Sequence, residues 1–169
     1  MDSLIAKLST YDLVNNVIVG TVIYYAGAYC LNIKTLENLS MLGEFSIVYF
    51  VGLITSRVGS LLIEPICKFL KIVVYAPLEQ YYVAEKKDKK ISAIVEVNNM
   101  YRSFSAGFLM ILFVKFISNN WGAVIESLNK ENILLWCLAI GFILAFRKQT
   151  FYVKSRVEAA LKTDDNNMD

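Results

Sequence analysis

The chain of 169 residues contains no histidine, only two prolines and only three cysteines. Without histidine, a His-based general base or catalytic triad is excluded. The absence of histidine and the isolation of the cysteines also argue against a transition-metal site. The eight glycines form neither GxxxxGK[ST] nor GxGxxG, so no phosphate-binding loop is predicted. These absences predict a protein that is not an enzyme and holds no cofactor and no metal.

Charge is also scarce, and apolar residues are in excess. Charged residues make up 19% of the chain and hydrophobic residues 56%, against about 25% and roughly 45–50% in soluble domains. The excess lies in residues 13–33, 42–63, 103–118 and 133–146. The first two stretches can cross a hydrocarbon core of about 30 Å, and flanking residues extend the other two. The sequence therefore predicts an all-α membrane protein with four transmembrane helices arranged as two antiparallel hairpins.

Two alternatives to this arrangement follow from the same stretches. A soluble bundle would have to bury almost every face of all four helices, which a chain this small cannot easily do. A cleaved signal peptide would fit Ala26-Gly27-Ala28, which resembles a cleavage site. However, Asn15 and Asn16 interrupt the apolar run that such a peptide requires.

The basic residues indicate the orientation of the chain. Of 17 lysines and arginines, seven lie between the second and third stretches and five follow the fourth. Each of the two other loops carries only one. The positive-inside rule places both termini and the middle loop in the cytoplasm, as an even number of spans also requires. We expect a multi-pass protein of the inner (plasma) membrane whose first partner is the lipid bilayer.

The spans divide the chain into five segments. Residues 1–12 are an interfacial lead-in, 13–63 the first hairpin, 64–102 a cytoplasmic helical segment, 103–146 the second hairpin, and 147–169 a cytoplasmic C-terminal helix and tail. Pro65 is placed to start a helix or kink one, and Pro77 interrupts the segment that follows. A helix from Ile91 is expected to lead directly into the third span, and the C-terminal helix is expected to reach about Lys162.

Small residues form a stripe on the second predicted span. Gly52, Ser56 and Ser60 recur at i, i+4 and i+8, with Gly59 beside them. Small side chains at this spacing let a second helix approach closely in a membrane. The stripe therefore predicts a helix-packing or oligomerisation face.

Arg57 is a permanent cation inside the same span, bordering the stripe. Pairing with Asp12, Asn15 or Asn16 at the inner end of the first span would satisfy its charge. Snorkelling to the inner headgroups is an alternative, although helical side chains here lean toward the outer leaflet. A pore or gating role is the third reading.

A basic cluster lies in the cytoplasmic segment and includes Lys86, Lys87, Lys89 and Lys90. Acidic neighbours interrupt it, so direct nucleic-acid binding is not expected. The positive-inside rule by itself accounts for most of these lysines, because cytoplasmic loops of membrane proteins are rich in lysine and arginine. Apolar residues between them would be stranded on a short helix unless something covered them. The predicted partner-binding residues are Lys86, Lys87, Lys89, Lys90, Ile94 and Arg156.

The stretch TYDLVNNVIVGTVIYY, residues 10–25, resembles a Tyr-Asp-x-x-Asn-x-x-x-Pro-Gly-x-x-x-Tyr pattern of small four-span membrane proteins from bacterial anti-phage operons. Tyr11, Asp12, Asn15, Gly20 and Tyr24 match, and Val19 stands where the pattern has proline. Size and layout look most like the KwaA-type membrane subunits of the Kiwa system. This resemblance implies a homo-oligomeric inner-membrane sensor that detects infection and regulates a soluble DNA-binding partner.

The resulting hypothesis is a non-enzymatic sensor or scaffold subunit that oligomerises and docks a soluble cytoplasmic partner. The alternative is a small oligomeric channel or membrane-depolarising effector, with Asn15, Asn16, Thr55 and Ser56 lining its pore. A membrane protein that neutralises a toxin is a third option.

Overall fold

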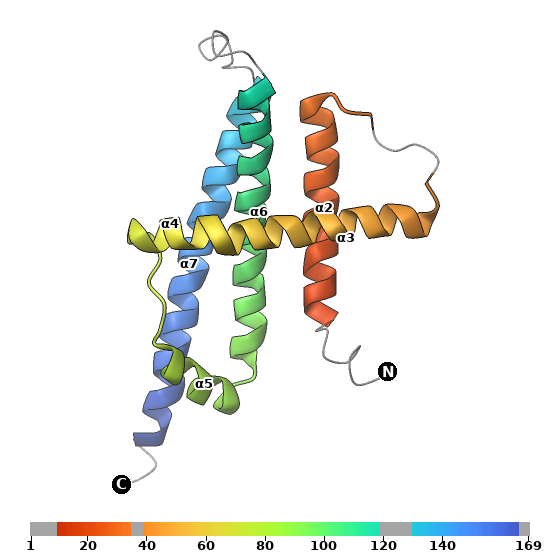
Figure 1. The fold of residues 1–169 in the computed structure, drawn as a ribbon. Coiled ribbons are helices and arrows are strands. Elements are labelled where there is room, and N and C mark those ends of the chain that lie inside the picture. The colour runs from red at the N-terminus through yellow and green to blue at the C-terminus, as the bar shows by residue number, and fades with distance from the viewer. Residues whose placement is uncertain (1–9, 35–38, 119–129, 166–169) are drawn as a thin grey trace.

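The computed structural model describes residues 10–34, 39–118 and 130–165, and every regular element in these ranges is helical. The side chains of residues 10–12, 14 and 163–165 lie outside the described part. In chain order (Figure 1) the elements are α2 (Thr10–Leu31), α3 (Met41–Val58), the π-helical turn η1 (Gly59–Ile63), α4 (Glu64–Phe69), α5 (Leu78–Lys87), α6 (Lys90–Ser118) and α7 (Lys130–Asp165).

α3, η1 and α4 form one continuous rod from Met41 to Phe69. Ser40 caps its start, because the Ser40 hydroxyl accepts a hydrogen bond of 3.3 Å from the amide of Gly43. Pro65 lies in the first turn of α4, directly after the π turn. A π turn shifts the backbone hydrogen bonds by one residue, so the amide hydrogen that proline lacks does not interrupt the rod. Pro65 therefore starts α4 as predicted.

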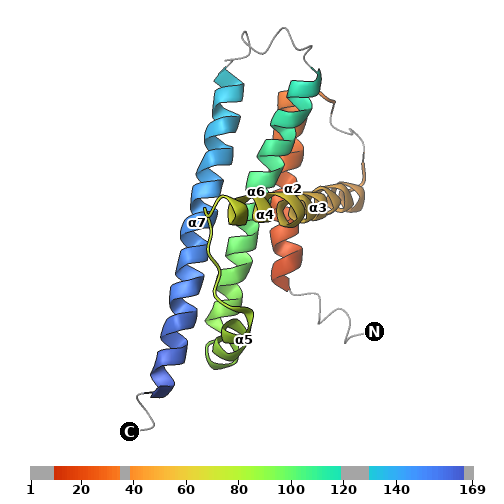
Figure 2. The same cartoon turned by 60° about the vertical axis from the view of Figure 1, so that its left-hand side comes forward.

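α6 and α7 are long helices that lie side by side (Figures 1 and 2). Near one end of the pair, Lys115 of α6 forms an ion pair of 3.3 Å with Glu131 of α7. Near the other end, Ile91 packs in one cluster with Val157. The two helices therefore run in opposite directions. α6 includes the predicted helix from Ile91 and continues into the third apolar stretch, as predicted.

The rod formed by α3, η1 and α4 runs across α2, α6 and α7 rather than alongside them (Figures 1 and 2). Its middle lies against Arg102 of α6, and its end packs with Ala106 and Phe146. Because the rod lies across α6 and α7, it cannot run along the bilayer normal when these two helices do. The predicted hairpin of the first two stretches is thus not observed.

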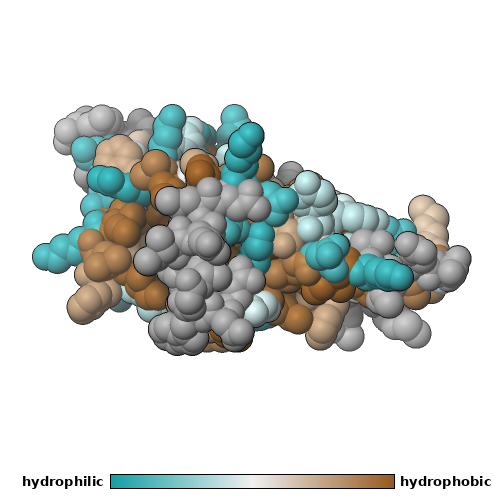
Figure 3. Space-filling view, turned by 90° about the horizontal axis from the view of Figure 1, so that it is seen from above, coloured by the Kyte–Doolittle hydropathy of each residue, from teal (hydrophilic) through white to brown (hydrophobic). Residues whose placement is uncertain are grey.

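Three helices in the described residues are long and apolar enough to cross a membrane: Met41–Phe69, Lys90–Ser118 and Lys130–Lys162. α2 is not among them, so the predicted four spans are not confirmed. Large apolar side chains are exposed along the rod, for example Phe50 at 62% and Leu61 at 71%. Brown apolar residues also occupy much of the face seen from above (Figure 3). An apolar surface of this extent is typical of a protein embedded in lipid.

Three hydrophobic clusters include residues of α6. The first joins α2, α6 and α7, and at its centre the rings of Phe104 and Phe142 stack at 4.7 Å. The second joins the end of the rod to α6 and α7 around Phe146, which is fully buried. The third joins α5 to α6 and α7 around Ile91 and Val157. α6 is therefore the central element of the fold.

Candidate functional site

The small-residue stripe lies where the rod crosses α2. A Cβ atom added to Gly52 would lie 1.9 Å from the carbonyl oxygen of Asn16. A Cβ added to Gly20 on α2 would lie 1.7 Å from the carbonyl oxygen of Val48. The two backbones are therefore in direct contact, and only glycine fits at either position. The predicted packing role of Gly52 thus coincides with a close approach between helices within this chain.

Gly59, beside the stripe, contacts a different helix. A Cβ added to Gly59 would lie 3.3 Å from Cγ of Arg102, so Gly59 packs against α6. Ser56 and Ser60 are half-buried, and the Ser60 hydroxyl donates to the carbonyl of Arg57 at 2.9 Å. Thr55 is buried, and its hydroxyl donates to the carbonyl of Gly52 at 2.9 Å. The stripe and Gly59 thus serve two helix contacts within one chain.

The side chain of Arg57 is exposed and makes no hydrogen bond or ion pair with any residue that the structure describes. Asn15 donates instead to the carbonyl of Glu96 at 3.3 Å. Asn16 meets the rod at Gly52, about one and a half helical turns from Arg57. The predicted pairing of Arg57 with Asn15 or Asn16 is therefore not observed, because the described contacts of the rod with α2 lie between Glu44 and Gly52 and Arg57 lies beyond them. The side chain of Asp12 lies outside the described part.

The main ionic cluster lies where the rod meets α6, and sequence reasoning missed it. Glu64 accepts from Arg102 through one carboxylate oxygen, and its other oxygen lies 2.7 Å from the Lys68 ammonium. The side chains of Arg102 and Glu64 are only 12% and 19% exposed. The Lys68 ammonium also lies 4.6 Å from the centre of the Tyr75 ring. One carboxylate thus joins two cations and fixes the rod on α6.

A polar layer continues from this cluster toward α5. Asn98 and Thr150 are buried, and the Thr150 hydroxyl lies 3.2 Å from the side-chain oxygen of Asn98. In the connection between α4 and α5, burial and then the charge of Glu64 raise the pKa of Tyr75. The Tyr75 hydroxyl therefore stays neutral at physiological pH. This layer positions helices and offers no activated nucleophile.

Beyond this layer, α5 packs against residues 90–102 of α6 and residues 147–162 of α7. We call this part the α5–α7 platform. Ala84, Ile91 and Val157 form its buried centre, each at most 1% exposed. Its apolar core makes the platform a packed unit rather than a loose loop.

An ion pair closes the platform. Arg156 of α7 donates to Asp88 at 2.7 Å, and Asp88 also accepts from the amide of Lys90 at 3.0 Å. Hydrogen bonding from Arg156, and then from the Lys90 amide, lowers the pKa of Asp88. The hydrogen bonds with Asp88 and Tyr152 raise the pKa of Arg156. Asp88 thus links the turn between α5 and α6 to α7.

We expect Asp88→Asn to loosen this turn at pH 7. Because the folded-state pKa of Asp88 is lowered, its stabilisation is present above its unfolded pKa of about 4 and is lost at lower pH. Hydrogen exchange of amides 88–91 should therefore be faster in the variant at pH 7, and the difference from wild type should shrink as the pH falls below about 4. Lys154→Gln, which removes the loose pair with Glu158, serves as the control. Equal exchange at pH 7 would show that the pair does not hold the turn.

The predicted partner-binding residues divide into two groups. Lys86, Lys87, Lys89 and Lys90 are exposed on the platform. Ile94 is half-buried in the platform core, and its carbonyl accepts from Gln149 at 3.3 Å. Of the apolar residues that were expected to need an outside partner, Ile91, Ile94 and Val95 are covered by α5 and α7, whereas Val83 is 47% exposed. Arg156 is likewise held by Asp88.

α5 carries an exposed stripe that the sequence did not single out. Leu78, Tyr82 and Lys86 recur at i, i+4 and i+8, and Leu78 and Tyr82 are 66% and 55% exposed. Their spacing puts them on one helical face. An aromatic and an aliphatic side chain beside a cation form the kind of surface that binds proteins.

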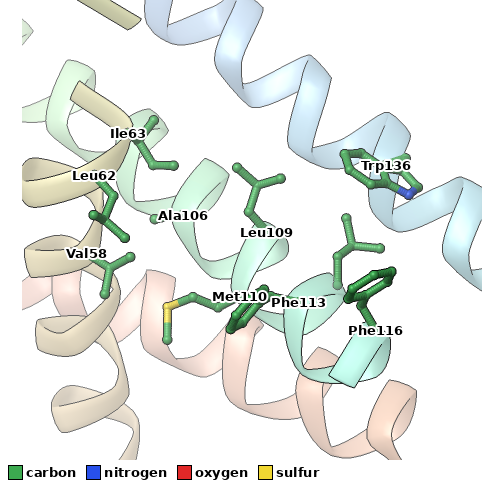
Figure 4. A pocket seen from close by; sticks show the side chains of 10 residues that line it. Val58, Leu62, Ile63, Ala106, Leu109, Met110, Phe113, Phe116 and Trp136 are labelled. Atoms are coloured by element: carbon green, nitrogen blue, oxygen red, sulfur yellow. The ribbon is translucent and has the colours of Figure 1, made fainter. Parts of the chain in front are cut away.

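A hollow of about 440 Å³ lies between η1, α6 and α7 (Figure 4). Leu62, Leu109, Met110 and Trp136 point into it, together with other apolar residues. Its lining supplies dispersion contacts and almost no hydrogen-bonding groups, so it suits a hydrocarbon chain better than a polar substrate. In the described residues no three His, Cys, Asp or Glu side chains come together as a metal site.

No protein-family model, curated protein or solved structure matches this chain. The resemblance to Kiwa membrane subunits therefore stays a prediction, and the function is argued from the geometry.

Proposed function

We propose that this chain is a non-enzymatic membrane subunit whose α5–α7 platform docks a soluble cytoplasmic protein with an acidic surface. In this proposal the apolar helices hold the platform at the inner membrane, and the chain forms homo-oligomers. Both termini lie in the cytoplasm. The partner is a separate protein, because the platform offers a basic and aromatic surface but no catalytic group.

The observation that carries this proposal is the platform itself. α6 and α7 extend well beyond their apolar stretches, and α5 joins them in a separate hydrophobic cluster. A membrane anchor alone needs no such packed extension. Its outer surface combines Leu78 and Tyr82 with Lys86, Lys89 and Lys90, all exposed. A rigid surface of this kind reduces the entropy that binding would cost.

The level at which the rod crosses α6 and α7 supports a placement in the membrane. It meets α6 near Arg102 and Ala106, where the third apolar stretch begins, and it meets α7 at Phe146, where the fourth ends. We propose that α6 and α7 cross the bilayer and that the rod lies along its inner boundary. The four-span arrangement of two hairpins is the alternative, in which the rod would turn to cross the membrane.

The resemblance to Kiwa membrane subunits supports a more specific form of the proposal. In that form the oligomer senses infection at the envelope, and the docked partner is a DNA-binding defence protein. The residues that match the Kiwa pattern include Gly20, which the structure places at the crossing of α2 and the rod.

The first test is affinity purification from the native membrane in mild detergent, with wild type and a platform variant compared. Lys86→Glu, Lys89→Glu and Lys90→Glu together reverse the platform charge without touching its core. We expect one soluble protein to copurify with wild type in fixed ratio and to be reduced at least about tenfold by the triple variant, as close like charges cost several kcal/mol.

Lys34→Glu and Lys130→Glu together are the control, because both lysines are exposed and lie away from the platform. Copurification should be unchanged in this variant. If the platform variant retains the partner as well as wild type, the platform is not the docking surface. If no soluble protein copurifies with wild type, the docking function itself is wrong.

A further inference from the structure

A second basic surface lies apart from the platform, between the connection after α4 and one face of α7. Lys71, Val74, Leu144, Arg147, Lys148 and Phe151 line a hollow of about 380 Å³. We call it the basic hollow. In both ribbon views the segment between α4 and α5 runs along α7, which brings residues far apart in the sequence together (Figures 1 and 2).

Three cations meet at the basic hollow without an acidic neighbour among its lining residues. Lys71, Arg147 and Lys148 are all exposed. Their side-chain nitrogens form no ion pair or hydrogen bond with any described residue, in contrast to Lys68, Arg102, Lys115 and Arg156. The charge of the basic hollow is therefore available to an outside anion.

The same hollow exposes large apolar side chains beside the cations. Val74, Leu144 and Phe151 are 57%, 56% and 70% exposed. A small hydrophilic anion would make no use of these groups. An amphiphile with an anionic head would use both parts, with its head on the cations and its chain along the apolar side chains.

The backbone at Lys71 supplies an independent observation. Lys71 has φ of 55°, and the hydrogen bond from the Ile72 amide to the Cys67 carbonyl measures 2.8 Å. Glycine usually occupies such a left-handed position after a helix, because it has no Cβ. A lysine at this position is strained, yet the tight turn holds its side chain at the mouth of the basic hollow. This is the arrangement expected if the cation is used.

The depth of the basic hollow matches a phospholipid headgroup. Leu144 belongs to the last turn of the fourth apolar stretch, and Arg147 and Lys148 follow immediately where charge begins. Headgroup phosphates of the inner leaflet lie at this boundary if α6 and α7 cross the membrane as proposed.

We propose that the basic hollow binds the phosphate of an anionic phospholipid, with one acyl chain against Leu144 on the membrane side of Arg147 and Lys148. The proposal rests on the membrane placement of α6 and α7 but not on a soluble partner. A failed copurification would therefore leave it standing, and a failed lipid titration would leave the docking proposal standing.

The test is a titration of the purified full-length protein in neutral detergent with short-chain phosphatidylglycerol, followed by native mass spectrometry. Short-chain phosphatidylcholine and inorganic phosphate are titrated in parallel. We expect saturable binding of phosphatidylglycerol, with weaker binding of phosphatidylcholine and no displacement by inorganic phosphate at equal concentration.

The decisive variant is Lys71→Gly with Arg147→Gln and Lys148→Gln. Glycine favours the left-handed backbone, so this variant keeps its turn while losing three charges. We expect affinity for phosphatidylglycerol to fall about fivefold per cation, or roughly 100-fold in total. Lys86→Gln with Lys89→Gln and Lys90→Gln removes the same charge from the platform and should bind as wild type.

Three results would overturn the proposal. Equal weakening in both triple variants would mean that net charge, not the basic hollow, attracts the lipid. Displacement by inorganic phosphate would make the hollow a plain anion site. Equal affinity for phosphatidylcholine would remove the role of the cations.

Discussion

Gly52→Val is expected to destabilise this protein by about 3 kcal/mol or more, because the new side chain has no space. Even the Cβ would lie 1.9 Å from the Asn16 carbonyl oxygen, and that atom belongs to a helical backbone that cannot move alone. Overpacking a tight contact costs about 1–3 kcal/mol, and more where a backbone must shift. At about 2–4 °C per kcal/mol, the melting temperature of the purified protein in detergent should fall by roughly 10 °C.

Gly141→Ala is the matched control, because a Cβ at Gly141 of α7 meets nothing within 4 Å. Alanine has a higher helix propensity than glycine, so the control should melt at or slightly above the wild-type temperature. Gly20→Val should lower stability as Gly52→Val does. The double variant should lose less free energy of unfolding than the two single variants added together, because both changes disrupt the same helix contact. A Gly52→Val protein that melts with the wild type would refute the close crossing of α2 and the rod.

Glu64→Gln should destabilise the protein by about 3–5 kcal/mol, since it leaves the charge of Arg102 buried without a counter-ion. Arg102 is 12% exposed and packs on Gly59, so its guanidinium cannot easily turn toward water. The rod should also separate from α6. To detect this, Val58→Cys and Ala106→Cys are added, and the disulfide cross-link between the two new cysteines should form with Glu64 present but not in the Glu64→Gln variant. Melting in detergent gives the free-energy change.

Lys68→Gln and Glu158→Gln are the controls for this prediction. Lys68 shares the carboxylate of Glu64 but is 52% exposed, so its loss should cost about 1 kcal/mol at most. Glu158 forms an exposed pair of 3.9 Å with Lys154 on α7, and its loss should cost about 0.3–0.5 kcal/mol. Replacing Glu64 and Arg102 together by leucine should restore part of the stability. An equal effect of Glu64→Gln and Glu158→Gln would show that the pair of Glu64 and Arg102 is not a structural tie.

Local patterns in the sequence predicted much of the helical structure. The apolar run after Ile91 and the basic run after Phe146 each predicted a helix, and α6 and α7 contain them without a break. Pro77 predicted an interruption, and the helix α5 starts immediately after it, although the preceding helix α4 already ends at Phe69. Such features depend on residues close along the chain, so they are readable without knowledge of the fold.

Contacts between distant residues could not be predicted in the same way. The opposite charges of Glu64 and Arg102, each next to the end of an apolar stretch, were a usable signal. However, their pairing required the knowledge that the rod meets α6 there. Conversely, Ile94 was expected to need an outside partner because the sequence does not show that α7 folds back over it.

The sequence by itself determined that this chain is helical, strongly apolar and built for a membrane, because composition and periodicity set those properties locally. It also determined where close helix contacts were feasible, since only glycine or serine leaves that space. The tertiary structure alone decided that the stretch from Met41 to Phe69 crosses its neighbours instead of pairing alongside them. The reason is physical: hydropathy is the same for a helix that spans, crosses or lies flat, and only contacts such as Gly20 with Val48 and Glu64 with Arg102 distinguish these directions.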